Sequence, residues 1–342
     1  MIDLGAVNAY RAGIQGLVSN DYKTMPDGDD AIVECHGLTR SFAGECILEG
    51  ADFNLNRGEF VFLFGGSGKG KSVFLRTVFG IGNPVIFGSD NCVDGEVYVF
   101  GKALHGISKS DRRKRYTEIY SRLGYCPQKG GLFGSMSVAE NIAFPLREHF
   151  YDVFYKSDVC ASVREYLSTR SIEYRCGEEL KALNENFGIR AQQSRSSIIL
   201  GEVNLLENII IQARVDYCME LVGLDPWKDR DKDVAQLSGG MLKRVAVARV
   251  LADFPELIIL DEPTTGLDPP LSLEVFDLIS KLKKMGYTVL ATTHDNRLGY
   301  FDPDRIDWIH ERKIRRLGAK QDVIASDDEA VRRFFFPDEF RE

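Results

Sequence analysis

The sequence predicts an α/β fold with a mostly parallel sheet. Short, strongly apolar runs of strand length, such as Phe60–Phe64 and Leu257–Leu260, have the composition of strands buried on both faces. These runs alternate along the chain with segments of helical periodicity, such as residues 211–224. Strands that alternate with helices are typical of a parallel sheet covered by helices.

The elements expected in the first hundred residues begin at Ala31. Four of them are strands, at Ile32–Cys35, Phe53–Leu55, Glu59–Phe64 and Val97–Phe100. The fifth is a helix at Val73–Val78. Near the other end of the chain we expect two buried strands with a helix between them: Leu257–Leu260, Leu271–Met285 and Tyr287–Thr292. Residues 1–30 are polar and contain turn formers, which predicts a weakly ordered N-terminal extension.

Composition excludes several classes of protein. The 342 residues are 44% hydrophobic and 27% charged, which indicates a folded chain of about two domains or one elaborated domain. The 43 basic and 51 acidic residues give a net charge of −8, which argues against a nucleic-acid partner. No run approaches the roughly 20 apolar residues of a membrane span. The start lacks the pattern of a secretory signal, and the seven cysteines form no CxxC pair, so we expect a cytoplasmic protein.

One segment predicts a phosphate-binding loop. Gly65-Gly66-Ser67-Gly68-Lys69-Gly70-Lys71-Ser72 matches G-x-x-x-x-G-K-[ST] between an expected strand and an expected helix. Glycines let backbone N–H groups turn toward phosphate oxygens, and the helix N-terminus adds partial positive charge. Lys71 is predicted to reach the β- and γ-phosphates and Ser72 to ligate Mg²⁺, while Lys69 either touches phosphate or points into solvent. Kinases, GTPases and motors share such loops, so the rest of the chain decides the function.

A second motif adds a family resemblance. Leu237-Ser238-Gly239-Gly240-Met241 precedes the basic helix that begins with Leu242-Lys243-Arg244. This pattern resembles the signature of ATP-binding cassette (ABC) ATPases, LSGGQ, with Met241 in place of the usual glutamine. The resemblance implies that Ser238, Gly239 and Gly240 grip the γ-phosphate of an ATP held by the other subunit.

The resemblance assigns roles to three residues around the attacking water. Asp261, at the end of Leu257–Asp261, matches the carboxylate that holds Mg²⁺ through water, and Glu262 matches the general base. Gln128, in Gly124-Tyr125-Cys126-Pro127-Gln128, matches the glutamine that joins the metal site to the helical subdomain.

Three further matches complete the implied site. His294 matches the switch histidine that contacts the γ-phosphate, and Asp268, in Gly266-Leu267-Asp268, matches a loop that crosses to the partner subunit. Phe42 lies 29 residues before Lys71 and either stacks on adenine or belongs only to the core.

The family resemblance also implies a domain plan. We expect a P-loop NTPase with a RecA-like, mostly parallel core, an antiparallel β subdomain and an enlarged helical signature subdomain. The ATPase domain is expected at 31–325, its helical subdomain at about 129–236, and a C-terminal tail at 326–342. Gln128 and Ser238 are 110 residues apart, which is long for the family and predicts an insertion at about 151–208. The insertion either contacts a permease or is a surface elaboration. In the C-terminal tail, the aromatic residues Phe334–Phe336 pack either on their own domain or on the second subunit.

Finer resemblances favour one kind of transporter. The run Asn141–His149, the form LSGGM-x-KRVA-x-AR at 237–249, and the C-terminal segment resemble the ATPases of MCE-type (Mla-like) lipid transport systems. The cassette motifs together imply a dimer, with a second copy or a paralogue, that closes on two ATP molecules and reopens after hydrolysis; we expect a homodimer. The finer resemblances imply a permease partner with an MCE-domain protein, on the inner face of the cytoplasmic membrane. Lipoprotein release, nutrient import and a cell-division-type regulatory ATPase are the alternatives.

Overall fold

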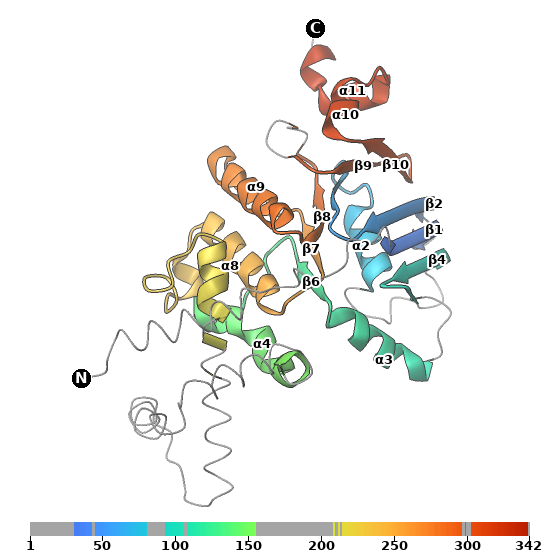
Figure 1. Ribbon diagram of the computed structural model, residues 1–342. Helices are drawn as coiled ribbons and strands as arrows, with labels where there is room; N and C mark the ends of the chain where they lie inside the picture. Colours follow the sequence, from blue (N-terminus) through green and yellow to red (C-terminus); the bar gives the residue numbers. More distant parts are fainter. Residues whose placement is uncertain are drawn as a thin grey trace, which may run out of the picture.

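The structure is a computed structural model, shown in Figure 1. It describes residues 31–42, 45–80, 93–104, 109–154, 208, 211–212, 214–295, 298 and 302–340. The expected N-terminal extension and almost all of the expected insertion at 151–208 lie outside the described residues.

A six-stranded sheet forms the centre, in the order β10-β9-β3-β8-β7-β6. Its strands are β3 (Phe60–Phe64), β6 (Leu123–Cys126), β7 (Leu257–Asp261), β8 (Thr288–Thr293), β9 (Arg305–His310) and β10 (Lys313–Gly318). All neighbours pair in parallel except β9 and β10, which form an antiparallel hairpin. The predicted α/β fold with a mostly parallel sheet is therefore confirmed.

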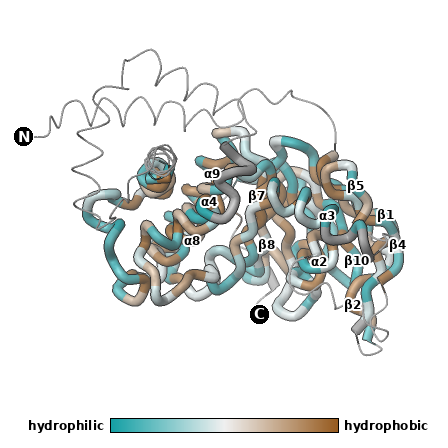
Figure 2. Tube along the Cα trace, turned by 90° about the horizontal axis from the view of Figure 1, so that it is seen from below, coloured by the Kyte–Doolittle hydropathy of each residue, from teal (hydrophilic) through white to brown (hydrophobic). Residues whose placement is uncertain are grey.

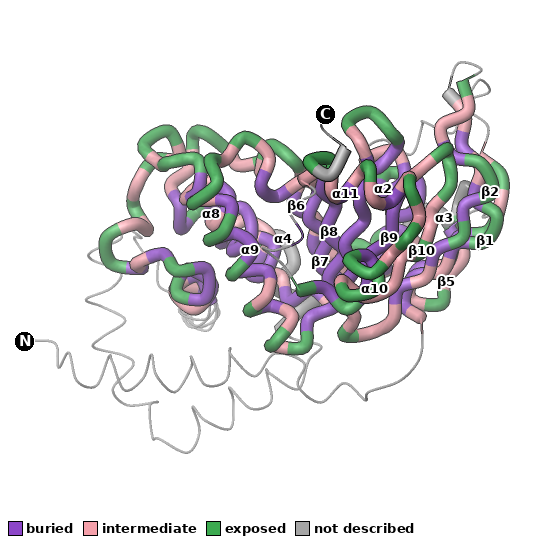
Figure 3. Tube along the Cα trace, turned by 90° about the horizontal axis from the view of Figure 1, so that it is seen from above, coloured by how far each residue is buried: buried purple, intermediate pink, exposed green. Residues whose placement is uncertain are grey.

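Both faces of this sheet are covered, which explains why its strands read as continuous apolar runs. Successive side chains of a strand point to opposite faces. Phe60, Phe62 and Phe64 pack in one apolar cluster with helix residues, whereas Val61 and Leu63 pack in a second cluster on the other face. Figure 3 shows β7 and β8 as buried, and Figure 2 shows the hydrophobic residues that run through them.

A separate antiparallel sheet has the order β2-β1-β4-β5. It consists of β1 (Ala31–Phe42), β2 (Glu45–Asn56), β4 (Val93–Val99) and β5 (Lys102–Ala103). The sequence predicted only part of each of the two long strands, Ile32–Cys35 of β1 and Phe53–Leu55 of β2. Gly37 and Gly50 have positive φ, and the pairing of the two strands shifts register near them, so the alternating pattern is interrupted there.

The helices lie around the central sheet and beyond one end of it. They are α2 (Lys71–Phe79), α3 (Lys109–Tyr120), α4 (Val138–Phe154), α8 (Gly239–Ala252), α9 (Pro269–Lys284), α10 (Lys320–Ile324) and α11 (Glu329–Phe335), with short 3-10 helices at Val234–Gln236 and Pro337–Phe340. Residues 214–221 are also helical. Figure 1 places α4 and α8 on one side of the sheet and the four-stranded sheet on the opposite side. Within the described residues, no helix combines the length and apolarity needed to cross a membrane.

The C-terminal aromatic residues pack on their own chain. The Phe335 ring is buried and lies 5.0 Å, centroid to centroid, from Phe64 at the end of β3. Phe334 lies 5.1 Å from Trp308 of β9, and Phe336 packs on the same cluster. Of the two expectations for Phe334–Phe336, the structure therefore shows packing on the chain's own domain.

Candidate functional site

The predicted phosphate-binding loop connects β3 to α2. Gly70, directly before α2, has φ of 103°, and a Cβ atom there would lie 3.1 Å from Ile47 Cγ2, so only glycine suits this position. The Lys71 side chain is 4% exposed, and its Nζ donates to the carbonyl oxygens of Gly65, at 2.7 Å, and Gly66, at 3.2 Å. The loop therefore holds its lysine ammonium at its own centre, next to the N-terminus of α2.

Asp261 ends β7 and is buried beside the loop. Its Oδ1 lies 3.5 Å from the Ser72 hydroxyl and accepts a hydrogen bond from Thr292 Oγ1 at 2.8 Å. Tyr125 donates to Oδ2 at 3.3 Å, and burial together with the nearby Asp261 raises the pKa of this phenol. A hydroxyl and a carboxylate from two elements are hard oxygen donors of the kind that Mg²⁺ prefers, so Ser72 and Asp261 fit this ion.

Glu262 is the point where the predicted catalytic residues meet. Its carboxylate is 12% exposed and lies 3.1 Å from Lys71 Nζ. Gln128 Nε2 donates to Glu262 Oε2 at 2.9 Å, and His294 Nδ1 lies 3.2 Å from the same oxygen. Thr265 Oγ1 adds a hydrogen bond at 2.8 Å. The structure thus brings together residues that follow four neighbouring strands, β3, β8, β7 and β6.

The surroundings of Glu262 keep it ionised. Burial by itself raises the pKa of this carboxyl group, but the hydrogen bond from Thr265 and the pairing with Lys71 and His294 outweigh it and lower the pKa. Glu262 also has a φ of 49°, which is strained for a non-glycine residue and sets the side chain at the end of β7. An ionised carboxylate held in this way can accept a proton from a water molecule.

The signature residues lie at the start of α8, beside α9. Ser238 caps α8 by accepting a hydrogen bond from Met241 N at 3.3 Å, and both Ser238 and Gly239 are exposed. Gly240 is packed so tightly that a Cβ atom would lie 2.9 Å from Leu271 of α9. Asp268 caps α9 beside it and accepts from Leu271 N at 3.0 Å. Among the described residues, no hydrogen bond or ion pair joins Ser238–Gly240 to the phosphate loop.

Two predicted residues lie at the edge of the site. Lys69 is exposed and its amide donates to Gly66 O at 3.2 Å. Phe42 is the last residue of β1 and pairs with Glu45 of β2 at the tip of the hairpin. The side chain of Phe42 lies outside the described residues, so its stacking role stays a prediction.

Four partners in the site were not assigned roles from the sequence. They are Tyr125, Thr265, Thr292 and Lys243, whose ammonium in α8 donates to the Gln128 carbonyl oxygen. Thr265 could have been suspected, because it lies three residues after Glu262 in a turn. The other three depend on strand register and helix packing, which no short motif specifies.

The sequence profile of the ABC transporter family matches residues 48–265, more than half of the chain. This chain belongs to the ABC transporter family. It is therefore an ATP-binding cassette with ATPase activity, and the predicted family is confirmed.

Relatives of this ABC ATPase carry different names. It is 28% identical over 311 residues to the probable ribonucleotide transport ATP-binding protein mkl of Mycobacterium leprae, covering 91% of this chain and 70% of mkl. It is 27% identical over 320 residues to the spermidine/putrescine import ATP-binding protein PotA of Aster yellows witches'-broom phytoplasma, covering 87% and 70%. The solved structure of cbiO1 from Clostridium perfringens superposes with a TM-score of 0.58 at 24% identity, covering 91% of this chain and 97% of cbiO1, and supports the fold.

Proposed function

We propose that this ABC ATPase energises an MCE-type transporter that moves phospholipid or another lipid between membranes. The ATPase chemistry depends on one observation, the convergence of Lys71, Gln128 and His294 on Glu262. The lipid assignment depends on the run Asn141–His149 in α4, together with the signature form at 237–249 and the C-terminal segment. The names of mkl and PotA concern two different substrates, so the relatives alone do not select one.

The chain's own residues would perform the reaction as follows. Backbone N–H groups of Gly65–Ser72 and the N-terminus of α2 bind the phosphates. Ser72, Gln128 and Asp261 would hold Mg²⁺, which neutralises charge on the phosphates when bound. Glu262 orients the attacking water and accepts its proton, while His294 lies beside the same carboxylate to contact the γ-phosphate.

The Lys71–Glu262 ion pair suggests how nucleotide prepares the general base. At 3.1 Å, Lys71 Nζ neutralises the carboxylate that must later act on water. A γ-phosphate in the loop competes for the same ammonium, and the pKa of Glu262 then rises because a cation that lowers it has turned away. Binding of ATP would therefore make Glu262 a stronger base at the moment when it is needed.

The exposed signature surface supports a homodimer as the working unit. Ser238, Gly239 and Asp268 are exposed at the starts of α8 and α9. Backbone N–H groups at a helix start bind anions well. We propose that these residues complete the phosphate site of a second copy, so two ATP molecules lie between the two chains.

An aromatic patch near α4 is the proposed contact for the permease. Phe133 is 38% exposed, and its ring lies 4.8 Å from Phe144 and 4.7 Å from the Arg249 guanidinium. Arg249 also donates to Gly131 O at 2.7 Å. A rigid, partly exposed aromatic surface with a cation suits a short amphipathic helix of a membrane subunit. On this proposal the ATPase lies peripherally on the inner face of the cytoplasmic membrane.

The first experiment is purification of the complex from native membranes in mild detergent. A multi-span permease with an MCE-domain protein is the expected result. A permease with a solute-binding protein would favour nutrient import, for which the similarity to PotA is the supporting observation, and would contradict the lipid assignment. Partners of lipoprotein release or of cell division would contradict it as well.

The chemistry is tested on the purified chain. Glu262→Gln is expected to bind ATP but to lose at least about 100-fold in turnover, because general acid–base catalysis contributes about 10²–10⁴. The same variant should accumulate an ATP-bound dimer, measured by size-exclusion chromatography. Glu329→Gln, an exposed carboxylate on α11, is the matched control. Turnover of Glu262→Gln near the wild-type value would contradict the general-base role.

A further inference from the structure

A glycine-rich turn carries Gln128, and this turn has little rigidity of its own. It begins at Pro127, whose carbonyl oxygen accepts a hydrogen bond from the Gly130 amide at 2.7 Å. Gly130 and Gly131 have φ of 77° and 65°. Consecutive glycines leave the backbone many conformations besides this one. Gln128 is also exposed, so burial does not fix its side chain. Its position must therefore be set by a neighbouring element.

That element is α8. Lys243 Nζ donates a hydrogen bond to the carbonyl oxygen of Gln128. Close to this contact, a Cβ atom on Gly130 would lie 3.4 Å from Cβ of Ala246. Arg249 Nη1 donates to the carbonyl oxygen of the glycine that follows, at 2.7 Å. Residues three positions apart are neighbours on a helix surface, so one side of α8 contacts the turn at both ends.

The turn also places the Gln128 amide on the general base. Gln128 Nε2 donates to Glu262 Oε2 at 2.9 Å, while the carbonyl oxygen of the same residue accepts from Lys243. One residue therefore connects the ammonium in α8 with the carboxylate after β7. A shift of the Gln128 backbone would move its amide relative to Glu262, and small misplacements at a reacting centre cost much of the rate.

The Lys243 ammonium is costly to bury. The residue is 9% exposed, and burial lowers its pKa, although the nearby Glu262 and Asp261 carboxylates favour the charged form. An apolar side chain would fill the same space without this cost, so packing alone does not explain a lysine at this position. A charged donor makes a stronger hydrogen bond to a carbonyl oxygen than a neutral donor does.

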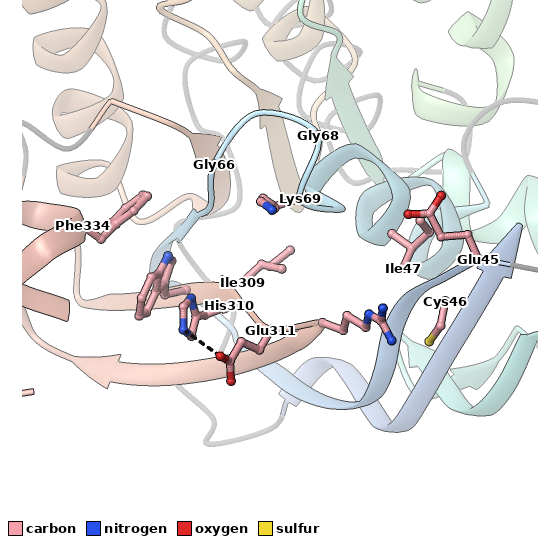
Figure 4. A pocket seen from close by; sticks show the side chains of 12 residues that line it. Glu45, Cys46, Ile47, Gly66, Gly68, Lys69, Ile309, His310, Glu311 and Phe334 are labelled. Carbon is pink, nitrogen blue, oxygen red and sulfur yellow. Dashed lines mark ion pairs between the residues drawn. The ribbon is translucent and has the colours of Figure 1, made fainter. Parts of the chain in front are cut away.

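Neither Lys243 nor Gln128 lines the cavity that adjoins the phosphate loop (Figure 4). The described residues around this cavity come from the phosphate loop, the start of β2, the β9–β10 hairpin and α11, and they include His310. The ammonium of Lys71 is held by carbonyl oxygens of the loop itself. A change at Lys243 therefore leaves the phosphate loop as it is, and we expect nucleotide binding to persist.

We propose that Lys243 is a positioning residue for ATP hydrolysis, which holds the Gln128 backbone so that the Gln128 amide stays on Glu262. This inference rests on the proposed role of Glu262 as the general base. It adds α8, the helix that Ser238 caps, to the elements that set up the attacking water.

The first test is Lys243→Met, which keeps an unbranched side chain but removes the charge and the donor. It should lower kcat about tenfold, the usual effect of losing a partner that orients a site residue. The Kd of ATP should not change. Lys243→Ala, with the best helix former, is measured in parallel, so that misfolding of one variant leaves the other. A wild-type kcat in a folded variant would overturn the proposal.

The second test asks whether Lys243 acts through Gln128. Gln128→Ala should lower kcat by itself, and Lys243→Met should cause no further loss in that background, because no amide remains to be positioned. A loss of the same factor in both backgrounds would overturn the proposal, because the ammonium would then act directly on Asp261 and Glu262. If Glu262→Gln and Gln128→Ala both turned over ATP like the wild type, the proposed catalytic assignment itself would fail, which is a distinct outcome.

Lys281→Met is the matched control. Lys281 of α9 also donates to a backbone carbonyl oxygen, that of Leu221, at 3.0 Å, but contacts neither Gln128 nor Glu262. The control should keep the wild-type kcat. An equal loss in Lys281→Met and Lys243→Met would overturn the proposal, because any lysine that joins two helical segments would then have the same effect.

A last measurement needs no turnover. Hydrogen exchange of residues 127–131, followed by mass spectrometry in the chain without nucleotide, reports how firmly the turn is held. Exchange should become faster in Lys243→Met and Lys243→Ala and stay as in the wild type in Lys281→Met. Unchanged exchange in both Lys243 variants would overturn the proposal, because the turn would then be fixed without the lysine.

Discussion

Replacing Asn141 with alanine is expected to destabilise the protein strongly, although Asn141 touches no proposed catalytic residue. The side chain is fully buried at the start of α4. Its Oδ1 accepts from Phe133 N at 2.8 Å, and its Nδ2 lies 3.0–3.1 Å from the carbonyl oxygens of Phe133, Met136 and Ser137. One amide group therefore fixes the whole turn that presents Phe133.

The magnitude follows from the number of bonds that can form at once. Nδ2 carries two protons and can therefore donate two hydrogen bonds at a time among its three acceptors. Together with the bond that Oδ1 accepts, the Asn141 side chain makes three hydrogen bonds. At about 1 kcal/mol for each, Asn141→Ala should lower the free energy of unfolding by about 3 kcal/mol. The turn is partly exposed, so water can reach some of the freed peptide groups and keeps the loss from being larger.

The assay is urea unfolding followed by circular dichroism, with Ser135→Ala as the control. Ser135 is exposed in the same turn and its change should stay within about 0.5 kcal/mol. Asn141→Asp keeps the acceptor but directs a carboxylate at three carbonyl oxygens. It should be destabilised at neutral pH and recover partly in acid, where the introduced carboxyl group can donate. A loss below about 1 kcal/mol for Asn141→Ala would refute this reasoning.

Three other predictions concern the core, an ion-pair network and the general base. Phe335→Ala should cost about 3 kcal/mol in unfolding free energy, because it removes a buried ring that packs on Phe64, and urea unfolding measures this. Burial raises the pKa of Glu256, but the hydrogen bonds from Arg122 and Arg57 outweigh it and lower the pKa. The ionised Glu256 therefore stabilises the folded state at neutral pH, and this stabilisation is lost as the pH falls below about 4.5. Glu256→Gln should therefore be less stable by about 2 kcal/mol at pH 7 and show a shallower loss in acid, measured by unfolding at several pH values. Because the pKa of Glu262 is lowered in the chain without nucleotide, kcat/KM, which reports the free enzyme, should not fall between pH 8 and pH 6 through protonation of this group, and a pH profile of kcat/KM checks this.

Some mismatches between sequence and structure have identifiable causes. Helix α9 begins at Pro269, two residues before the predicted start at Leu271, because Asp268 provides the cap and proline suits the first turn. Strand β10 was not predicted, because it lies at the sheet edge and carries exposed and half-buried residues without a clear alternation. Strand β6 was not predicted, because Gly124 interrupts its short apolar run.

The phosphate loop, the buried strands and the family can all be inferred from the amino-acid sequence. These features are local, because a strand, a glycine-rich turn and a helix start are encoded within a dozen residues. Gly70 is an example: its positive φ requires glycine at that position of the turn. The order of the signature, Asp261 and His294 along the chain is likewise a property of the sequence alone.

Which of these residues meet depends instead on the tertiary structure. The order β3-β8-β7-β6 places the ends of four strands side by side, so Lys71, His294 and Gln128 share the Glu262 carboxylate, whereas Ser238 caps α8. The cavity at His310 likewise arises from segments that are distant in sequence. Strand order and the packing between distant segments depend on burial of the whole sheet, and no local pattern contains that information.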